Sequence, residues 1–518
     1  MLQTASKQVG FFDASELIGP LPGGSFCALL AEHGERIVCD RDFAECYSER
    51  HGRPSIPPSM LAKVLLLQYR SGLSDREAME AVRWDLRWKA ALGLAVDHAG
   101  WDPSSLTRFR ARLLLHGKER LVLENSLRVA EELGLLDAPV EQIVDSTPML
   151  GAAATQDTVR LVRGGVRKLL DAVEAVDAAA ATLLEDSLEF DYAKPSEKPD
   201  CRWREKAERE RMLTRVAEDG ERCLRAVEKA DGLLEDDAVE DANDLLRELI
   251  GQDFDVDDDG IPRLHRGTRA GRILSVHDTE MRHGRKSSKQ RFDGFKLHAA
   301  ATNSQTPLLT AIEVTAASEQ DGPQAKQLVD QQPEVFKPKR LLGDTAYGNG
   351  PVRQELSERK VEVLAPVPEA PASDDRLLKR DFRIDLDEGT VTCPQGQAAQ
   401  IKTAASGERW ATFPKPVCDN CPLRSRCVGP VKGRRQIRIA PEEQLMIAAR
   451  QALDDPSTAE HLRRTRPRIE RLLSLLAYRY GARKSRYRGR RKAGLQAAWT
   501  AALVNLNPIG TRLAAGSA

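Results

Sequence analysis

The chain has 518 residues, of which 41% are hydrophobic and 30% are charged, and this composition excludes a disordered or fibrous protein. The length allows two to four domains, and 78 basic residues balance 78 acidic ones, so net charge alone indicates no partner. No apolar run reaches the roughly 18 residues of a membrane span, the first residues lack a signal-peptide pattern, and nine cysteines are too few for a disulfide framework, so we expect a cytoplasmic protein without membrane contact.

Residues 1–135 are predicted to form a helical N-terminal region. The segment from Ile56 to Gly117 has the pattern of short helices, and Ser74 and Glu77 have the spacing of a capping box, in which each side chain satisfies a free amide. A further helix is expected over DPSSLTRFRARLLLHG, with Ser104 or Ser105 as its N-cap. Helix-turn-helix pairs of this kind either bind DNA or serve as packing units, and both alternatives stay open.

A first core strand is expected within residues 136–157, where VEQIVDSTPM places an apolar strand that ends on Asp145. Residues 158–270 then indicate a long helical and acidic insertion, divided by the break FDYAKPSEKPDC. The stretch from Asp231 to Asp259 holds thirteen acids and one base. Within it DVDDDG begins like a calcium loop, but Arg266 replaces the glutamate that such a loop needs, so we interpret the stretch as a solvated acidic linker.

Residues 271–368 are predicted to complete a sheet. The runs ILSVHD, FDGFKLHAAAT and LLTAIEVT indicate strands, and GPQAKQLVDQQ indicates a helix. KRLLGDTAYG then predicts a buried strand that ends on Asp344, and KVEVLAPVP predicts one more. This order favours an α/β fold with a mixed sheet covered by helices, and it resembles the ribonuclease H-like fold. His298 is either a packed strand residue or a group near the site.

Residues 369–440 are interpreted as a Cys-rich insertion that precedes the last helix of the site. Cys393 begins a C-P-x-G motif, and Cys418, Cys421 and Cys427 follow with the spacing C-x2-C-x5-C. Four thiolates at such spacing are typical of a tetrahedral structural Zn²⁺ site. Four reduced cysteines in a loop are the alternative.

Residues 441–518 are predicted to carry that last helix and a basic tail. The stretch from Arg463 to Lys492 contains thirteen Lys and Arg residues and a single acid, Glu470. Pro467 fits a first helical turn, which would put Glu470 one turn into the helix. Glu470 either forms an ion pair with a neighbouring arginine or completes a metal site among bases that hold phosphates.

Asp145, Asp344 and Glu470 together form the minimum set of carboxylates that can hold two divalent metal ions for in-line phosphoryl transfer. Mg²⁺ and Mn²⁺ suit such hard oxygen ligands. One ion activates a water or a 3′-hydroxyl, and the other stabilises the leaving oxygen. An aspartate at the end of a buried strand is costly unless it is paired or binds a metal, although each aspartate alone is also compatible with an ordinary strand end.

Several motifs then occur in order along the chain: VDSTPM, SVHDTEMRHG, FDGFKLHAAAT, VTAASEQDG, LLGDTAYG and RIER…RYRGRRK. With them the chain resembles, from about Ile56 to Asn507, bacterial insertion-sequence transposases of the DDE class. The most similar branch is the one numbered eleven-eighty-two, which is related to cut-and-paste transposases with a YREK signature. The resemblance implies Asp145, Asp344 and Glu470 as the catalytic triad, two Mg²⁺ or Mn²⁺ ions, and strand transfer. It also implies DNA partners, namely terminal inverted repeats and target DNA, and a homodimer on paired ends.

The YREK spacing, Y-x2-R-x3-E-x6-K, coincides with Arg466 and Glu470, whereas Arg463 and Ala477 stand where Tyr and Lys are expected. The motif therefore carries a phosphate-contacting role over to Arg466 alone. Further DNA contacts are expected from other basic residues, namely Arg463, Arg483, Arg486, Arg488, Lys492, Lys296 and Arg282. A protein with these contacts would associate with the nucleoid. Two alternative functions are a DNA-binding protein without catalysis and a nuclease that cuts without joining.

Overall fold

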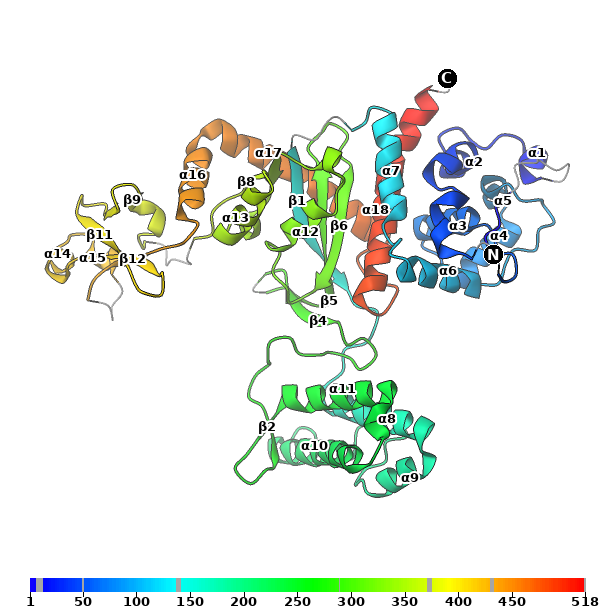
Figure 1. The fold of residues 1–518 in the computed structure, drawn as a ribbon, viewed down its shortest axis with the longest axis horizontal. Coiled ribbons are helices and arrows are strands. Elements are labelled where there is room, and N and C mark those ends of the chain that lie inside the picture. Colours follow the sequence, from blue (N-terminus) through cyan, green and yellow to red (C-terminus); the bar gives the residue numbers. More distant parts are fainter. Residues whose placement is uncertain are drawn as a thin grey trace.

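The structure is a computed structural model that describes residues 1–5, 13–48, 51–136, 141–287, 289–369, 375–428 and 433–516. Its centre is a mixed sheet with the strand order β4-β5-β1-β7-β8, in which β6 also pairs with β5 (Figure 1). β1 runs antiparallel to β5 and parallel to β7, which confirms the prediction of a mixed sheet. The strands are β1 (Glu141–Leu150), β4 (Arg282–Arg285), β5 (Arg291–Thr302), β6 (Leu309–Ala316), β7 (Arg340–Leu342) and β8 (Glu362–Leu364).

Helices cover both faces of this sheet because successive side chains of a strand point to opposite faces. Ile143 of β1 lies in an apolar cluster with Leu472 and Trp499, whereas the next residue, Val144, lies in a second cluster with Leu328. The first cluster includes side chains of α7 (Leu121–Glu132), α17 (Pro456–Ser474) and α18 (Arg490–Gly516), and the second includes side chains of α12 (Gln324–Asp330) and α13 (Gly350–Glu358). The sheet is thus the middle layer of a helix-sheet-helix arrangement.

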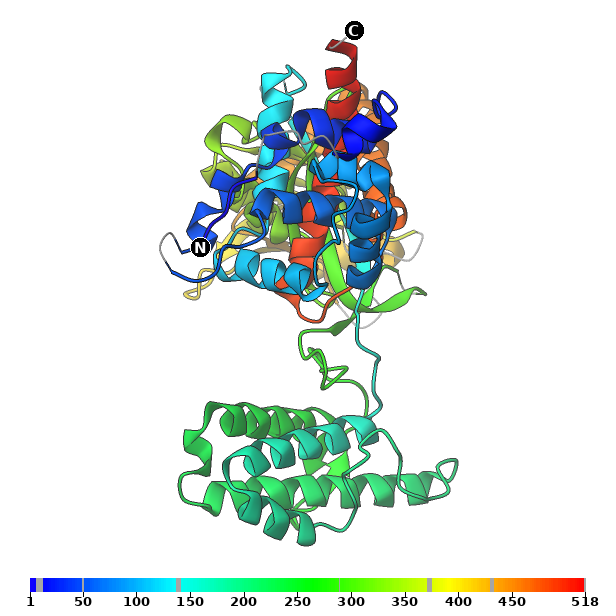
Figure 2. The same ribbon diagram turned by 90° about the vertical axis from the view of Figure 1, so that its right-hand side faces the viewer.

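The N-terminal helices pack beside the sheet, where α18 contacts β6, α7 and α3 (Figures 1 and 2). Ser74 and Glu77 form the predicted capping box at the start of α4. The predicted cap of α6 is wrong, because the helix begins at Ser104 itself and Asp102 accepts a hydrogen bond from the Ser104 amide. The helices of this region are α1 (Ala14–Ile18), α2 (Phe26–Ile37), α3 (Pro58–Ser71), α4 (Asp75–Trp84), α5 (Leu86–Leu92) and α6 (Ser104–Leu115).

A helical unit follows β1 and lies below the sheet in Figures 1 and 2, connected to it by two chain segments. It has an apolar core of its own, which includes Val166, Leu213 and Leu246. Its elements are α8 (Thr158–Val176), α9 (Ala178–Asp186), α10 (Lys206–Lys229), α11 (Asp237–Asp253), β2 (Phe254–Val256) and β3 (Pro262–Leu264). The acidic stretch Asp231–Asp259 is therefore not a linker, since most of it forms α11 and the first strand of a hairpin.

The run ILSVHD, residues 273–278, does not form the predicted strand, because none of these described residues pairs with a strand. Side-chain amides replace a neighbouring strand, since Gln252 accepts a hydrogen bond from the Ile273 amide and Gln156 accepts one from the Val276 amide. Ile273 and Val276 are buried against Leu161 of α8. The apolar run thus reflects burial against helices and not a position in a sheet.

The segment with the cysteine motifs forms a separate antiparallel sheet with the order β13-β12-β11-β10-β9, at the left of Figure 1. Its elements are β9 (Arg383–Asp385), β10 (Thr390–Thr392), β11 (Ala398–Thr403), β12 (Arg409–Thr412), α14 (Lys415–Asp419), α15 (Arg424–Cys427) and β13 (Gln436–Ile439). α16 (Glu443–Asp454) then leads back to α17. Among the described residues, no helix has the length and apolar character needed to cross a membrane.

Candidate active site

Asp145, Asp344 and Glu470 line one cavity of about 490 Å³ at the edge of the central sheet. Asp145 lies in β1, Asp344 caps the short 3-10 turn Thr345–Tyr347 after β7, and Glu470 lies near the end of α17. The fold therefore brings together three carboxylates that are far apart in the sequence. The other lining residues include Ser146, Arg285, Lys286, Lys296, Asp321, Arg466, Tyr478 and Arg483.

The strand that carries Asp145 does not end there, as the sequence had predicted, but continues to Leu150. The reason is its pairing, because β5 accompanies β1 as far as Leu150 whereas the parallel partner β7 pairs only with Glu141–Ile143. Asp145 thus lies just past the end of the parallel pairing, next to the loop that carries Asp344. The two aspartates therefore line the same cavity because the parallel pairing of β1 with β7 ends just before Asp145, and not because β1 itself ends there.

The helix that carries Glu470 is also longer than predicted. It begins at Pro456, where Asp455 accepts a hydrogen bond from the Thr458 amide, so Pro467 lies inside the helix and not in its first turn. The N-terminal signal of an Asp cap followed by Pro occurs eleven residues before the proline on which the prediction relied. Glu470 consequently projects from the C-terminal part of α17.

The three carboxylates interact electrostatically within the cavity. Burial raises the pKa of Asp145 to about 6, and the charges of Asp344 and Glu470 act in the same direction, against the opposing effects of the Ser146 amide and Arg466. The Ser146 amide donates a hydrogen bond to Asp145 Oδ1 at 2.8 Å. Mutual repulsion among oxygen ligands is the condition that a divalent cation relieves, so the donor set fits Mg²⁺ or Mn²⁺.

Glu470 has room to move, since its side chain is 57% exposed and its Oε1 lies 4.0 Å from Arg466 Nη2. Within the part of the chain that the structure describes, no three His, Cys, Asp or Glu side chains are spaced to hold a metal ion as they stand.

Two of the predicted DNA-contacting arginines line this cavity. Arg466 lies beside Glu470, and Arg483 reaches the carboxylate side of β1 by donating a hydrogen bond to the Pro148 carbonyl at 2.9 Å. Tyr478, in a single π-helical turn after α17, also lines the cavity and is 76% exposed.

The remaining predicted contacts differ in their surroundings. Arg463 is exposed but ion-paired with Glu460, and Arg282 donates hydrogen bonds to nearby carbonyls. Arg486 points inward, where it donates to the Leu73 carbonyl and lies over the ring of Tyr69. Arg488 and Lys492 are both exposed.

Two residues that the sequence motifs contained but did not single out contact the predicted site. Asp321, from VTAASEQDG, lines the cavity and pairs with Lys296 at 2.7 Å, so this lysine is already neutralised. Ser146 donates a hydrogen bond from its hydroxyl to Asp321. His298 is fully buried beside them, and burial lowers its pKa to about 4, so it is a neutral packed residue at pH 7. Spacing could not reveal Asp321, because it lies in a loop.

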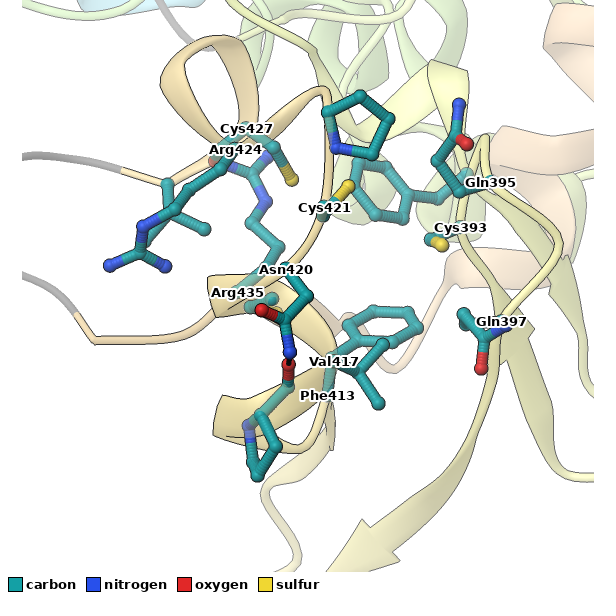
Figure 3. Close-up of a pocket in the computed structure, with 15 residues that line it drawn as sticks. Cys393, Gln395, Gln397, Phe413, Val417, Asn420, Cys421, Arg424, Cys427 and Arg435 are labelled. Carbon is teal, nitrogen blue, oxygen red and sulfur yellow. Dashed lines mark hydrogen bonds between the residues drawn. The ribbon is translucent and has the colours of Figure 1, made fainter.

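The four motif cysteines line a second cavity, of about 480 Å³, in the smaller sheet (Figure 3). Cys393 lies in the turn between β10 and β11, where its carbonyl accepts a hydrogen bond from the Gly396 amide. Cys418 belongs to α14 and Cys427 to α15, and Cys421 lies between them. Burial raises the pKa of Cys427, and the other three thiols also raise it, although Arg435 lowers it. The four thiols are therefore neighbours. Among the residues that the structure describes, however, they are not close enough together to hold a metal ion as they stand.

Comparisons with known proteins agree with this architecture. Residues 17–112 match a family described as Transposase domain (DUF772), and residues 252–506 match a family described as Transposase DDE domain. The second match contains Asp344 and Glu470, whereas Asp145 lies between the two matches, so its place in the site depends on the geometry. Searches among curated proteins and among solved structures found no match.

A DDE domain has the ribonuclease H-like fold, with which the mixed sheet between two helical layers agrees. Enzymes with this domain act on DNA and generally use divalent metal ions such as Mg²⁺. Both matching families are transposase domains, and together they take in most of the chain. The protein is a DDE transposase.

Proposed function

We propose that the transposase cleaves the ends of an insertion sequence and joins them to target DNA, with Asp145, Asp344 and Glu470 as the triad that binds two Mg²⁺ or Mn²⁺ ions. The observation that carries this proposal is the single cavity that the three carboxylates share with Arg466 and Arg483. When bound, the two ions would supply an activated oxygen nucleophile and a stabilised leaving oxygen.

The protein's own groups orient the DNA strand around these carboxylates. Arg466 and Arg483 line the same cavity as the acidic centre and would contact the phosphates next to the scissile bond. Arg483 would take the phosphate-contacting part that the signature lysine plays in related enzymes, since Ala477 cannot provide a charge. We also propose, from the motifs that the chain shares with it, that the protein belongs to the branch numbered eleven-eighty-two, with a homodimer holding paired ends and DNA binding that brings it to the nucleoid.

The test uses DNA that carries the repeats flanking the gene, with labelled 3′ ends, and a supercoiled target plasmid. Nicking and joining should require Mg²⁺ or Mn²⁺ and should fall by at least about 100-fold in Asp145→Asn, Asp344→Asn and Glu470→Gln, while DNA binding is retained. Glu460→Gln is the matched control, because Glu460 is a partly exposed carboxylate on the same helix that is paired with Arg463 and Arg464. Nicking without joined product would favour a nuclease, and unaltered nicking by all three variants would refute the triad.

We further propose that Cys393, Cys418, Cys421 and Cys427 bind a structural Zn²⁺ ion. Two tight turns support this proposal, since the Gly396 amide donates to the Cys393 carbonyl and the Cys421 amide donates to the Cys418 carbonyl, so Cys393 begins one short turn and Cys418 and Cys421 are the two ends of another. The four cysteines line the cavity shown in Figure 3, and a zinc site would require their sulfur atoms to converge on one ion.

Metal analysis of the purified protein tests this second site. We expect about one zinc per chain, and thiolate-to-metal charge-transfer absorption when Co²⁺ replaces the zinc. Cys421→Ser should lose both signals, whereas Cys201→Ser, which changes a cysteine of the helical unit, should keep them. Wild-type protein that contains no zinc after expression with added Zn²⁺ would refute the site.

A further inference from the structure

A fourth carboxylate, Asp321, lines the same cavity as the proposed triad. It lies in the loop between β6 and α12 and is held from two sides. Lys296 donates hydrogen bonds from Nζ to Asp321 Oδ1 and to the Glu319 carbonyl, both at 2.7 Å. The Ser146 hydroxyl donates to Asp321 Oδ2, also at 2.7 Å.

Ser146 connects this carboxylate to Asp145. Its backbone amide donates to Asp145 Oδ1 at 2.8 Å, while its hydroxyl donates to Asp321. One residue therefore contacts both carboxylates, with its backbone on one and its side chain on the other. The Asp321 carboxylate thus contacts the residue whose amide holds Asp145.

The charge of Asp321 is balanced before any metal binds. Burial opposes its ionisation, but the hydrogen bonds from Lys296 and Ser146 outweigh burial and lower its pKa. Because the Asp321 carboxylate is already paired with Lys296, it is better suited to hold a neighbouring metal ligand in place than to bind a metal ion itself.

We infer that Asp321 is a positioning residue, which Lys296 fixes in place and which acts through Ser146 to hold the Asp145 carboxylate in the orientation that metal binding needs. The inference rests on the proposed two-metal function. It also gives Lys296 a different part from the DNA contact that the sequence suggested, because the ammonium group is engaged within the protein and the side chain is only 15% exposed.

The test measures the Mg²⁺ concentration that gives half-maximal nicking, together with DNA affinity in the absence of metal. Ser146→Ala cuts the link but keeps the Lys296–Asp321 pair, and Asp321→Ala removes both contacts. Each should raise the half-saturating Mg²⁺ concentration by roughly 10-fold, as loss of a group that orients a metal ligand does, with DNA affinity unchanged. The double variant should need no more Mg²⁺ for half-maximal nicking than Asp321→Ala does, because both single changes break the same hydrogen bond between Ser146 and Asp321.

Asp330→Asn is the matched control, since Asp330 is on neighbouring α12 but pairs at the surface with Lys326 and Arg359. It should leave the Mg²⁺ dependence unchanged. Wild-type Mg²⁺ dependence in both Ser146→Ala and Asp321→Ala would overturn the inference. Loss of nicking in Asp321→Ala at every Mg²⁺ or Mn²⁺ concentration would also overturn it, by making Asp321 a ligand. Asp145→Asn, Asp344→Asn and Glu470→Gln are measured alongside, because unaltered nicking by all three would refute the proposed function itself.

Discussion

Replacement of Asp145 by Asn should stabilise the metal-free protein while it abolishes cleavage. The pKa of Asp145 rises from 3.8 to about 6, so ionisation of this group at neutral pH opposes folding. The upper limit of this cost is about 3 kcal/mol, at about 1.4 kcal/mol for each pH unit, and solvent screening reduces it to about 1–2 kcal/mol. Asn keeps the shape of the side chain and the hydrogen bond from the Ser146 amide but carries no charge.

The pH dependence has a defined sign. Below pH 3.8 the aspartate is protonated in the folded and unfolded protein, so the variant has no advantage there. The advantage grows as pH rises from about 4 to about 6 and is complete above that range. Asp330→Asn should behave in the opposite way, because hydrogen bonds from Arg359 and Lys326 lower the pKa of Asp330 and its ionised form stabilises the fold at neutral pH.

Thermal unfolding in EDTA, followed by circular dichroism at about pH 4 and about pH 7.5, measures the effect. The variant should unfold at a higher temperature at the neutral pH, by about 2–4 °C for each kcal/mol. Mg²⁺ at about ten times its Kd should then stabilise the wild type by about 1.4 kcal/mol and the variant much less. The difference in unfolding temperature between the two proteins should therefore become smaller when Mg²⁺ is added. An Asp145→Asn protein that is less stable than the wild type at neutral pH in EDTA would refute this reasoning.

Three further outcomes are expected. Arg466→Ala should weaken DNA binding and reduce the slope of log affinity against log salt by about 1, as filter binding at several salt concentrations would show. Arg486→Ala should instead lower the melting temperature with little change in that slope, because Arg486 connects the C-terminal basic segment to Leu73 and Tyr69 within the protein. A reduced slope in this variant would show that Arg486 contacts DNA after all. Lys296→Met should raise the Mg²⁺ requirement of nicking without changing the salt slope, and the reverse result would restore Lys296 as a DNA contact.

The sequence predicted the central sheet well where strands are long and apolar. β5 and β6 coincide with FDGFKLHAAAT and LLTAIEVT, because both are largely buried and pair with each other along most of their length. ILSVHD is also apolar but packs on helices, with glutamine side chains satisfying its amides. An apolar run indicates that a segment is buried, but it does not tell whether the segment pairs with a strand or packs against helices.

The site was predictable to the extent that its groups follow strands. Asp344 was found because it comes just after an apolar strand, and Asp145 was found although the end of its strand was misplaced. Asp321 was missed, since its contact with Ser146 joins residues 175 positions apart and depends on how a loop folds back over the sheet. The approach of Glu470 likewise depends on the packing of α17 against β1, which local sequence does not encode.

The most direct test of the central claim is anomalous diffraction from crystals of the transposase grown with an end DNA and Mn²⁺. We predict Mn²⁺ peaks within ligand distance of Asp145, Asp344 and Glu470, with Asp321 still paired to Lys296. Mn²⁺ bound elsewhere, or a Glu470 side chain that stays away from both aspartates in the DNA complex, would contradict the account.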